Sequence, residues 1–536
     1  MTIKKKQNRQ DAISEVLSGK IKSRADLMAI KRKLAKKYGE KILSHSEILK
    51  EYRNELGAQT TKRQSELERI LRKRSVRTMS GIAPVAVLTK PYPCPGKCAY
   101  CPTEKDVPQS YLSNEPAVMR AIRCGYDPYK QVQLRLSALE ANGHEPTKIE
   151  LIVIGGTWSV LPENYKYWYI TQCFKAANEY EKVKNVKIKV KNDNAKFKIA
   201  KLKNNLNLEQ KKNEIAKYKI IGVTLETRPD YINDKELLEM RELGATRVEL
   251  GVQAIDDKIL KLNKRGHGVA EITQATAMLK NYGFKVTYHI MPGLPGSAAK
   301  KDLAMFKKLF ADERFQPDQL KFYPTVVTRG SLLYKWWRAG KYKPYSDKVL
   351  QNLIMACKKA VPPYVRIIRL IRDIPGESII AGNLVTNLRQ VMKDRGVKCN
   401  CIRCREAKDE KFKVKNLKLK NIKYKASGGV EYFLSYESCD GKVLYGFCRL
   451  RLVRGSYMRD AALIRELHVY GELVSVGKTK KVQHAGLGKM LMKEAEKIAR
   501  QNGYKKIAVI AGVGVRGYYR KLGYKLENSY MVKNFV

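Results

Sequence analysis

The chain has 536 residues, which is too many for one ordinary hydrophobic core, and its 44% hydrophobic residues support globular packing in two to four domains. A formal net charge of +54 at pH 7 excludes an acidic surface and favours a polyanionic partner, with nucleic acid as the first candidate, although lysine enrichment also accompanies hyperthermophily. The sequence holds no apolar run of about 18 residues and no signal segment at its start. We therefore expect a cytoplasmic protein without a membrane segment, whose eleven cysteines bind metal rather than form disulfides.

Residues 1–77 are strongly basic, with 22 Lys or Arg against 9 Asp or Glu. Residues 27–38 predict a helix that ends at Gly39, with its apolar side chains on one face, and residues 67–74 predict a second basic helix. These patterns predict a small helical region with a cationic surface. We favour an RNA-binding role for it; the alternative is an ordinary solvated surface.

Three cysteines follow at Cys94, Cys98 and Cys101, with the spacing C-x3-C-x2-C. Three thiolates can hold three irons of a [4Fe-4S] cluster. The fourth iron then stays open for the amino and carboxylate groups of S-adenosylmethionine (SAM). The spacing resembles that of radical SAM enzymes; a zinc site or unrelated buried thiols are the alternatives.

Residues 78–375 alternate apolar strand patterns with amphipathic helices such as 235–241. This alternation predicts an α/β fold with a parallel sheet, here a partial TIM-like barrel that forms a radical SAM core. The predicted strands are 149–154, 220–225, 247–251, 285–290 and 319–323. The stretch 181–219, with 13 Lys against 4 acids, breaks the pattern. We interpret it as a partly helical excursion from the barrel, which either touches RNA or is simply solvated.

Polar and glycine residues at the strand ends are the candidate SAM ligands, because barrel chemistry gathers at the C-terminal ends of strands. Gly155, Gly156 and Thr157 follow the first predicted strand, Glu226 begins the run Glu226-Thr227-Arg228-Pro229-Asp230, and Gln253 ends a third strand. We interpret His267 and His289 as polar lining groups without a proton-transfer role.

Residues 376–410 form a connector that contains Cys399, Cys401 and Cys404. Three closely spaced thiols predict a structural zinc site with a fourth ligand from elsewhere, for which Cys357 and His267 are guesses. A second iron–sulfur cluster or free thiols are the alternatives. A metal here would fix the angle between two large domains.

Residues 411–536 predict a second catalytic domain. The segments 432–436 and 443–447 flank Asp440-Gly441 and predict a hairpin, and the run 483–488 has the form Q-x-x-G-x-G and opens a helix. Glycines at a helix N-terminus expose N–H groups that favour pyrophosphate. With predicted strands at 465–470 and 506–510 and a helix at 517–524, the order resembles an acetyltransferase of the GNAT type.

That resemblance implies an acetyl-CoA site. The strand before the loop would pair with pantetheine, and the loop and helix start would bind the pyrophosphate. A tyrosine of the last helix would lie near the thioester; we assign this catalytic place to Tyr519, with Tyr518 beside it, and one of the two can be a packing aromatic. The remaining residues implied are Glu466, Leu467, His468, Val469, Gln483, Gly486, Leu487, Gly488, Lys489 and Met490.

Three motifs together carry a family resemblance: they are 226–230, 320–325 (Leu-Lys-Phe-Tyr-Pro-Thr) and 372–375 (Arg-Asp-Ile-Pro). The chain resembles the catalytic subunit of Elongator, the tRNA uridine acetyltransferase family, over nearly its whole length. The resemblance implies that a 5′-deoxyadenosyl radical activates the acetyl methyl group of acetyl-CoA. The carbon then adds to C5 of the wobble uridine, tRNA position 34, and thioester hydrolysis leaves a carboxymethyl group. It also implies the anticodon loop of tRNA, whose bases can splay outward, and an external electron donor as partners.

In this family a lysine at the place of Lys148 contacts acetyl-CoA, whereas a solvated strand-edge lysine is the simpler interpretation. Two other functions stay open. One is a protein lysine acetyltransferase with a structural iron–sulfur cluster, and the other is a tRNA-binding scaffold without catalysis.

Overall fold

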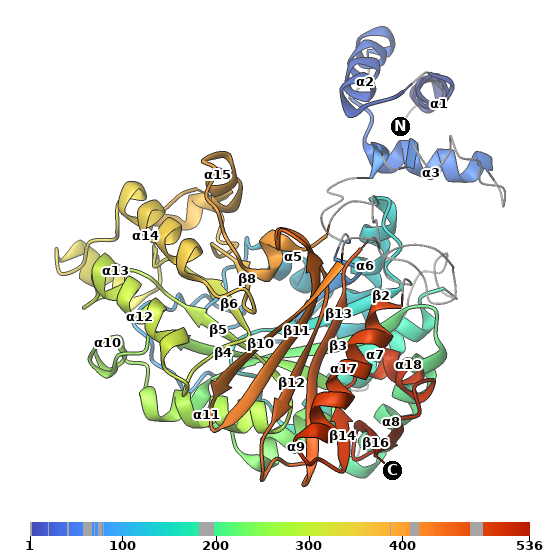
Figure 1. Ribbon diagram of the computed structural model, residues 1–536. Helices are drawn as coiled ribbons and strands as arrows, with labels where there is room; N and C mark the ends of the chain where they lie inside the picture. Colours follow the sequence, from blue (N-terminus) through green and yellow to red (C-terminus); the bar gives the residue numbers. More distant parts are fainter. Residues whose placement is uncertain are drawn as a thin grey trace.

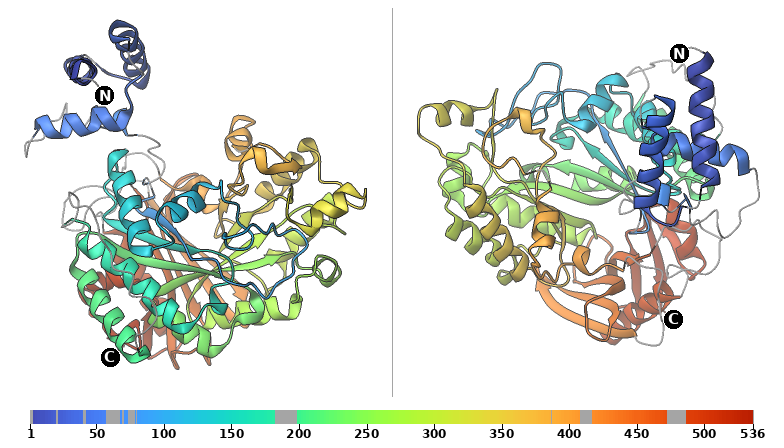
Figure 2. Two further views of the ribbon diagram at one scale, coloured as in Figure 1. Left: turned by 180° about the vertical axis from the view of Figure 1, so that it is seen from behind. Right: turned by 90° about the horizontal axis from the view of Figure 1, so that it is seen from above.

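The computed structural model describes residues 3–19, 21–39, 42–56, 67–68, 70–72, 78, 80–181, 198–385, 387–407, 417–471 and 486–535. Within these residues two seven-stranded sheets form the body of the molecule, and the N-terminal helices project from it (Figures 1 and 2). None of the described helices combines the length and the apolar character that a membrane span needs.

The first sheet is an open, curled barrel in which every neighbouring pair of strands is parallel. Its order is β1 (Ala83–Leu88), β2 (Lys148–Ile154), β3 (Lys219–Thr227), β4 (Ala245–Gln253), β5 (Lys285–Ile290), β6 (Gln319–Phe322) and β8 (Arg366–Arg369). This confirms the predicted partial barrel. The five predicted strands are β2 to β6, whereas β1 and β8 were not predicted.

Helices cover the outer face of the barrel, as the views in Figure 2 show. Between the strands they are α5 (Pro116–Arg123), α6 (Pro128–Ala141), α7 (Glu163–Glu179), α8 (Ile199–Ile215), α9 (Asp234–Glu242), α10 (Asp257–Leu262), α11 (Val269–Asn281), α12 (Ala299–Ala311), α13 (Leu332–Arg338) and α14 (Asp347–Ala360). The short strands β7 (Val327–Thr328) and β9 (Ile379–Ala381) pair antiparallel, and α15 (Leu388–Asp394) and α16 (Ile402–Arg405) lead out of the barrel.

The lysine-rich stretch 181–219 is not the excursion we expected, at least from residue 198 onward. Helix α8 buries Leu202 and Leu206, and the Asn213 side chain accepts a hydrogen bond from the Ile220 amide of β3 (2.7 Å). These apolar and polar contacts make α8 part of the barrel's helical cover. Residues 182–197 lie outside the described residues.

The second sheet has the order β10-β11-β12-β13-β14-β16-β15 and is antiparallel except between β13 and β14. Its strands are β10 (Leu417–Ala426), β11 (Gly429–Ser438), β12 (Leu444–Leu452), β13 (Ala461–Val469), β14 (Lys506–Val509), β15 (Lys525–Glu527) and β16 (Tyr530–Asn534). Helix α17 (Leu487–Gln501) lies on it, and α18 (Arg516–Arg520) is shorter than the predicted helix 517–524. The predicted hairpin is confirmed as β11 and β12.

The N-terminal helices α1 (Ile3–Ser18), α2 (Arg24–Tyr38) and α3 (His45–Leu56) share a small core of their own. The predicted helix 27–38 is confirmed; it begins earlier, at Arg24, because Ser23 caps it, and it ends at Gly39 with φ 61°. Of the second predicted helix, residues 69, 73 and 74 lie outside the described residues.

Buried charges join the two sheets. Arg465 of β13 donates to Asp318 (2.5 Å), which precedes β6, and it also pairs with Glu431 of β11 (3.0 Å). Glu466 pairs with Arg449 (3.0 Å). Arg449, Arg465, Asp318 and Glu431 are buried, and the side chain of Glu466 is 8% exposed, so the second sheet is fixed against the N-terminal ends of the barrel strands.

Candidate functional site

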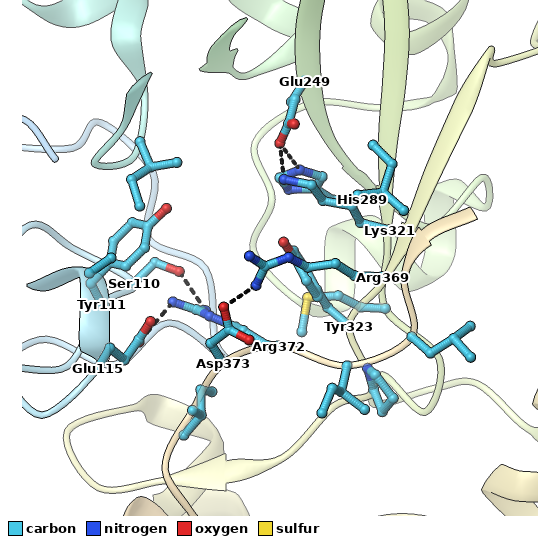
Figure 3. Close-up of a pocket in the computed structure, with 18 of the residues that line it drawn as sticks. Ser110, Tyr111, Glu115, Glu249, His289, Lys321, Tyr323, Arg369, Arg372 and Asp373 are labelled. Atoms are coloured by element: carbon cyan, nitrogen blue, oxygen red, sulfur yellow. Dashed lines mark hydrogen bonds and ion pairs between the residues drawn. The ribbon is translucent and has the colours of Figure 1, made fainter. Parts of the chain in front are cut away.

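A cavity of about 850 Å³ occupies the interior of the barrel (Figure 3). Its lining includes residues of all seven barrel strands, β1 to β6 and β8, and of the segments after β1, β6 and β8. Charged side chains converge on it from opposite walls, so the cavity can take a polar ligand.

The three-cysteine segment follows β1, at the C-terminal end of the barrel strands. Cys98 is buried, and its sulfur accepts a hydrogen bond from Nη1 of Arg265 (3.1 Å). A hydrogen bond from Cys101 and the charge of Arg265 lower the pKa of Cys98 to about 5. A second guanidinium, that of Arg228, packs so closely on the segment that a Cβ at Gly96 would lie 2.4 Å from its Nη1.

This environment fits an anionic iron–sulfur cluster. Nη1 of Arg228 is buried with no hydrogen-bond partner among the described atoms, and Asp230 fixes the other side of the same guanidinium (2.8 Å). Three thiols beside two buried cations suit the negative charge of a thiolate-bound cluster, whose potential depends on such charges.

The predicted turn after β2 lies beside these cysteines. Gly155 and Gly156 have φ of 136° and 97°, and a Cβ at Gly155 would lie 2.1 Å from Oγ1 of Thr89, so only glycine fits there. Oγ1 of Thr157 lies 3.7 Å from the Cys94 sulfur. The structure thus brings the predicted glycine turn to the predicted cluster ligands.

The other predicted SAM ligands line the cavity. Glu226 accepts a hydrogen bond from the Tyr111 hydroxyl (3.2 Å). Gln253 has φ 70°, and its buried Oε1 has no partner among the described atoms. A strained residue with an unsatisfied acceptor is a typical feature of a ligand site.

One wall of the cavity is a buried ionic cluster, of which only His289 was interpreted from the sequence as a lining group (Figure 3). Glu249 contacts the Lys321 ammonium and His289 Nε2, the latter at 2.9 Å. Burial raises the pKa of Glu249, but Lys321 and His289 outweigh it and hold the pKa well below its usual value. His289 is therefore a fixed lining group, as its interpretation from sequence proposed.

Two arginines extend this lining: Arg369 of β8 is the register partner of Lys321 on β6, and Arg372 follows β8 on the side of Ser110 and Glu115 (Figure 3). Arg369 pairs with Asp373, and Arg372 donates to Ser110 (3.0 Å) and pairs with Glu115 (3.4 Å). Lys321 and Arg372 belong to motifs that carried the family resemblance, so only their roles were missed. For Arg265, Glu249 and Arg369 no local pattern indicated a site.

The predicted acetyl-CoA residues lie on the second sheet. Strands β13 and β14 pair only as far as Ile464 and Val509, whereas β13 continues to Val469 against β12. Pantetheine can pair with a strand edge of this kind. The Glu466 carboxylate forms an ion pair with Arg449, and His468 contacts the Ser80 carbonyl through Nε2 (2.9 Å).

Helix α17 begins at Leu487 behind Gly486, which has φ 81°. Lys489 and Met490 are exposed on its first turn. The Tyr518 hydroxyl lies close to Gly488: a Cβ added to this glycine would be 2.8 Å from it. Tyr519, in contrast, is buried in the core with Tyr524. Tyr518, not Tyr519, therefore faces the helix start. Gln483 lies outside the described residues.

Lys148 is the first residue of β2, and burial lowers its pKa to about 8. It lies at the opposite end of that strand from Gly155. The candidate acetyl-CoA residues approach the barrel from the same end as Lys148, because β13 contacts the residues before β5 and β6. The two candidate sites thus lie at opposite ends of the parallel strands.

The connector cysteines come together. The sulfurs of Cys399, Cys401 and Cys404 lie within 4.8 Å of one another, the one such group of three found in the described part of the chain. Two thiolates on one zinc ion are about 3.8 Å apart, given Zn–S of about 2.3 Å. Neither Cys357 nor His267 joins the group.

Three family models match the chain: the Radical SAM superfamily over residues 92–304, the Radical SAM C-terminal domain over 317–395 and the Acetyltransferase (GNAT) family over 403–524. The chain is 44% identical to the tRNA uridine(34) acetyltransferase of Dehalococcoides mccartyi, over 86% of this chain and 99% of that protein. It is 38% identical to human Elongator complex protein 3, over 95% of this chain and 93% of that protein.

A solved structure is also similar. The archaeal Methanocaldococcus infernus Elp3 with an N-terminal deletion superposes with a TM-score of 0.71 at 40% identity, over 85% of this chain and all of that one.

Proposed function

This chain belongs to the family of tRNA uridine(34) acetyltransferases and Elongator complex protein 3, and from that premise we propose that it is a radical SAM enzyme that modifies wobble uridine in tRNA with acetyl-CoA. The product we propose carries a carboxymethyl group on C5 of uridine 34. One observation carries the proposal: a single chain combines a three-cysteine loop at the barrel mouth with an acetyltransferase-like sheet.

At the barrel mouth, Cys94, Cys98 and Cys101 would hold three irons of a [4Fe-4S] cluster. When bound, this cluster and SAM supply a carbon-centred radical. Arg265 orients the Cys98 thiolate and, with Arg228, offsets the negative charge. We assign contacts with SAM to the backbone of the turn at 155–157 and to the side chains of Glu226 and Gln253.

On the second sheet, we assign the pyrophosphate of acetyl-CoA to the N–H groups at the start of α17, from Gly486 to Met490. The β13 edge from Glu466 to Val469 would bind pantetheine. Tyr518 would lie near the thioester, because its hydroxyl faces Gly488. Gln483 and Lys148 stay predicted acetyl-CoA contacts.

The cavity offers a place for the target base. Lys321, Arg369 and Arg372 can donate to the carbonyl oxygens of uracil, and Tyr323 and Tyr111 can flank its ring. Fixed donors of this kind orient the base without reorganisation when it enters. The basic N-terminal region would hold the rest of the tRNA, and an external donor would supply electrons.

We also propose a structural zinc ion on Cys399, Cys401 and Cys404. The segment joins the barrel to the second sheet: the Ile402 amide donates to Val365 (2.9 Å), and Arg405 pairs with Glu437 (2.8 Å). A metal at this position would stiffen the junction.

The test is an anaerobic incubation of purified protein with acetyl-CoA, SAM, reductant and tRNA, followed by nucleoside analysis. We expect carboxymethylated uridine from the wild type, none from Cys98→Ala, and wild-type amounts from the control Cys124→Ala, which lies at the end of α5. If the chain were a protein lysine acetyltransferase, the Cys98→Ala variant would instead acetylate a protein substrate as well as the wild type does. Reductant-dependent 5′-deoxyadenosine excludes a scaffold without catalysis.

A further inference from the structure

We propose that the segment 329–345, with the loop 293–297 against it, binds the single-stranded nucleotides next to the target uridine. We call this surface the aromatic–basic patch. This proposal rests on the proposed function. In it, a surface outside the cavity recognises the RNA whose target uridine enters the cavity.

The composition of the patch suits single-stranded RNA. Residues 329–345 contain five aromatic side chains and five cations, and no acidic residue. Aromatic rings stack on bases and cations contact phosphates, and this combination is typical of single-strand binding. The five cations are Arg329, Lys335, Arg338, Lys341 and Lys343.

The cations of the patch are available for a partner. All five are exposed, and none forms an ion pair or hydrogen bond through its side chain with a described residue. On this protein many other basic side chains are paired, as Lys301 is with Asp256 at 2.9 Å. Five unpaired cations on one short segment therefore form a site for phosphates.

The patch contains a pocket of about 300 Å³. Trp336, Tyr342 and Tyr345 line it together with Lys341 and Lys343, and residues 293–297 of the facing loop complete the lining. The half-buried rings of Trp336 and Tyr345 beside these lysines form a recess in which a base can stack while its phosphate meets an ammonium group.

Hydrogen bonds hold two of these rings in place. The Tyr342 hydroxyl donates to the Gly293 carbonyl (2.7 Å), and the Tyr345 hydroxyl donates to Asp302 (2.7 Å). Asp302 also accepts from the Gly293 amide (2.8 Å), so its carboxylate is engaged and does not oppose an RNA phosphate. The recess is thus preformed, which lowers the cost of ordering it on binding.

The patch adjoins the mouth of the cavity. The Leu333 amide at the start of α13 donates to the carbonyl of Ala99 (2.7 Å), between Cys98 and Cys101. The Asn263 side chain donates to the Pro295 carbonyl (2.9 Å), and the Asn263 carbonyl accepts from the Ala99 amide (3.1 Å). Helix α13 is therefore joined to the cysteine loop by one backbone hydrogen bond, and the loop 293–297 is joined to it through Asn263.

The same continuity exists on the cavity side. Met291 lines the cavity and Gly293, two residues later, lines the pocket of the patch. A uridine turned into the cavity would place its neighbouring nucleotides over this rim. The surface thus suits an unpaired loop, because the bases of a duplex are stacked on one another and cannot enter the recess.

The test compares binding of an anticodon stem-loop RNA and of an RNA duplex of the same length, by fluorescence anisotropy at several salt concentrations. We expect Trp336→Ala to weaken stem-loop binding about fivefold or more and Trp336→Phe to restore most of it. The double change Lys341→Gln/Lys343→Gln should weaken stem-loop binding about tenfold and lower the salt slope by about one to two.

The control is Lys307→Gln/Lys308→Gln, which removes the same charge. Both lysines are exposed near the C-terminal end of α12, which in an α/β barrel lies at the end of the strands opposite the cysteine loop. It should change binding less than about twofold. If Lys341→Gln/Lys343→Gln weakens the binding of the stem-loop and of the duplex equally, or weakens the binding of neither, the proposal is overturned.

Reductive cleavage of SAM without RNA serves as the readout of an intact barrel, and it should be unchanged in all of these variants. The failure of the proposed function would look different: the wild type would form no modified uridine, whatever its affinity for the stem-loop. Normal uridine modification at low RNA concentration by Lys341→Gln/Lys343→Gln would overturn the patch and leave the proposed function standing.

Discussion

Lys280 provides the sharpest test of the buried interface between the two sheets. It is fully buried in α11, and its Nζ makes no hydrogen bond with a described atom, with Asp318 at 3.5 Å and Glu431 at 3.7 Å. Three buried arginines already face these two acids and Glu466. Burial, and then the charge of Arg465, lower the pKa of Lys280 from 10.5 to about 8.

This lowering means that holding the charged lysine costs about 3 kcal/mol of folding free energy at pH 7. We therefore predict that Lys280→Met, which keeps the volume and leaves three arginines facing three acids, raises the free energy of unfolding by up to about 3 kcal/mol. Because the folded-state pKa is the lower one, the unfolded chain binds more protons between pH 8 and 10.5 and wild-type stability rises there. At pH 9.5 the advantage of the variant should shrink to about 1 kcal/mol.

Urea unfolding followed by tryptophan fluorescence at pH 7 and pH 9.5 measures both effects, and comparing the two proteins cancels every other titration. The exposed Lys307→Met is the control and should change stability by less than about 0.5 kcal/mol. A variant less stable than wild type at pH 7, or an advantage that does not depend on pH, would refute the reasoning.

Three further changes have defined outcomes. Gly512→Ala should destabilise the chain by about 3 kcal/mol in urea unfolding, because its Cβ would lie 1.9 Å from the Ile221 carbonyl of β3; unchanged stability would contradict the packing. Gly155→Ala should keep its iron but weaken SAM binding at least about tenfold in equilibrium dialysis, since the turn must move away from Thr89, and wild-type affinity would exclude this turn from the site. Cys401→Ser should remove zinc measured by mass spectrometry and speed proteolysis at the connector; retained zinc would exclude the proposed ligand set.

The sequence identified those features whose cause is local. The strand–helix alternation, the cysteine spacing and the glycine turn at Gly155 each depend on a few adjacent residues, and all three lie where the pattern indicated. Strands β1 and β8 were missed because one contains a proline and the other has arginine at both ends, so neither reads as a buried apolar strand.

Features that depend on distant pairs could not be predicted. Arg265 meets Cys98 across 167 positions and Arg465 meets Asp318 across 147, so no window of sequence contains either pair. The same reason explains the lysine-rich stretch: its charge indicated an exposed excursion, yet α8 is fixed by Asn213 to β3. The choice between Tyr518 and Tyr519 likewise needed the position of Gly488.

The most direct measurement is on the anaerobically reconstituted protein: iron and sulfide per chain, with the electron paramagnetic resonance spectrum of the reduced protein before and after addition of SAM. We expect about four irons per chain at the barrel mouth and a spectrum that SAM changes, with both lost in Cys98→Ala. Zinc in place of iron at Cys94, Cys98 and Cys101, or a spectrum that SAM leaves unchanged, would contradict radical SAM chemistry in this chain.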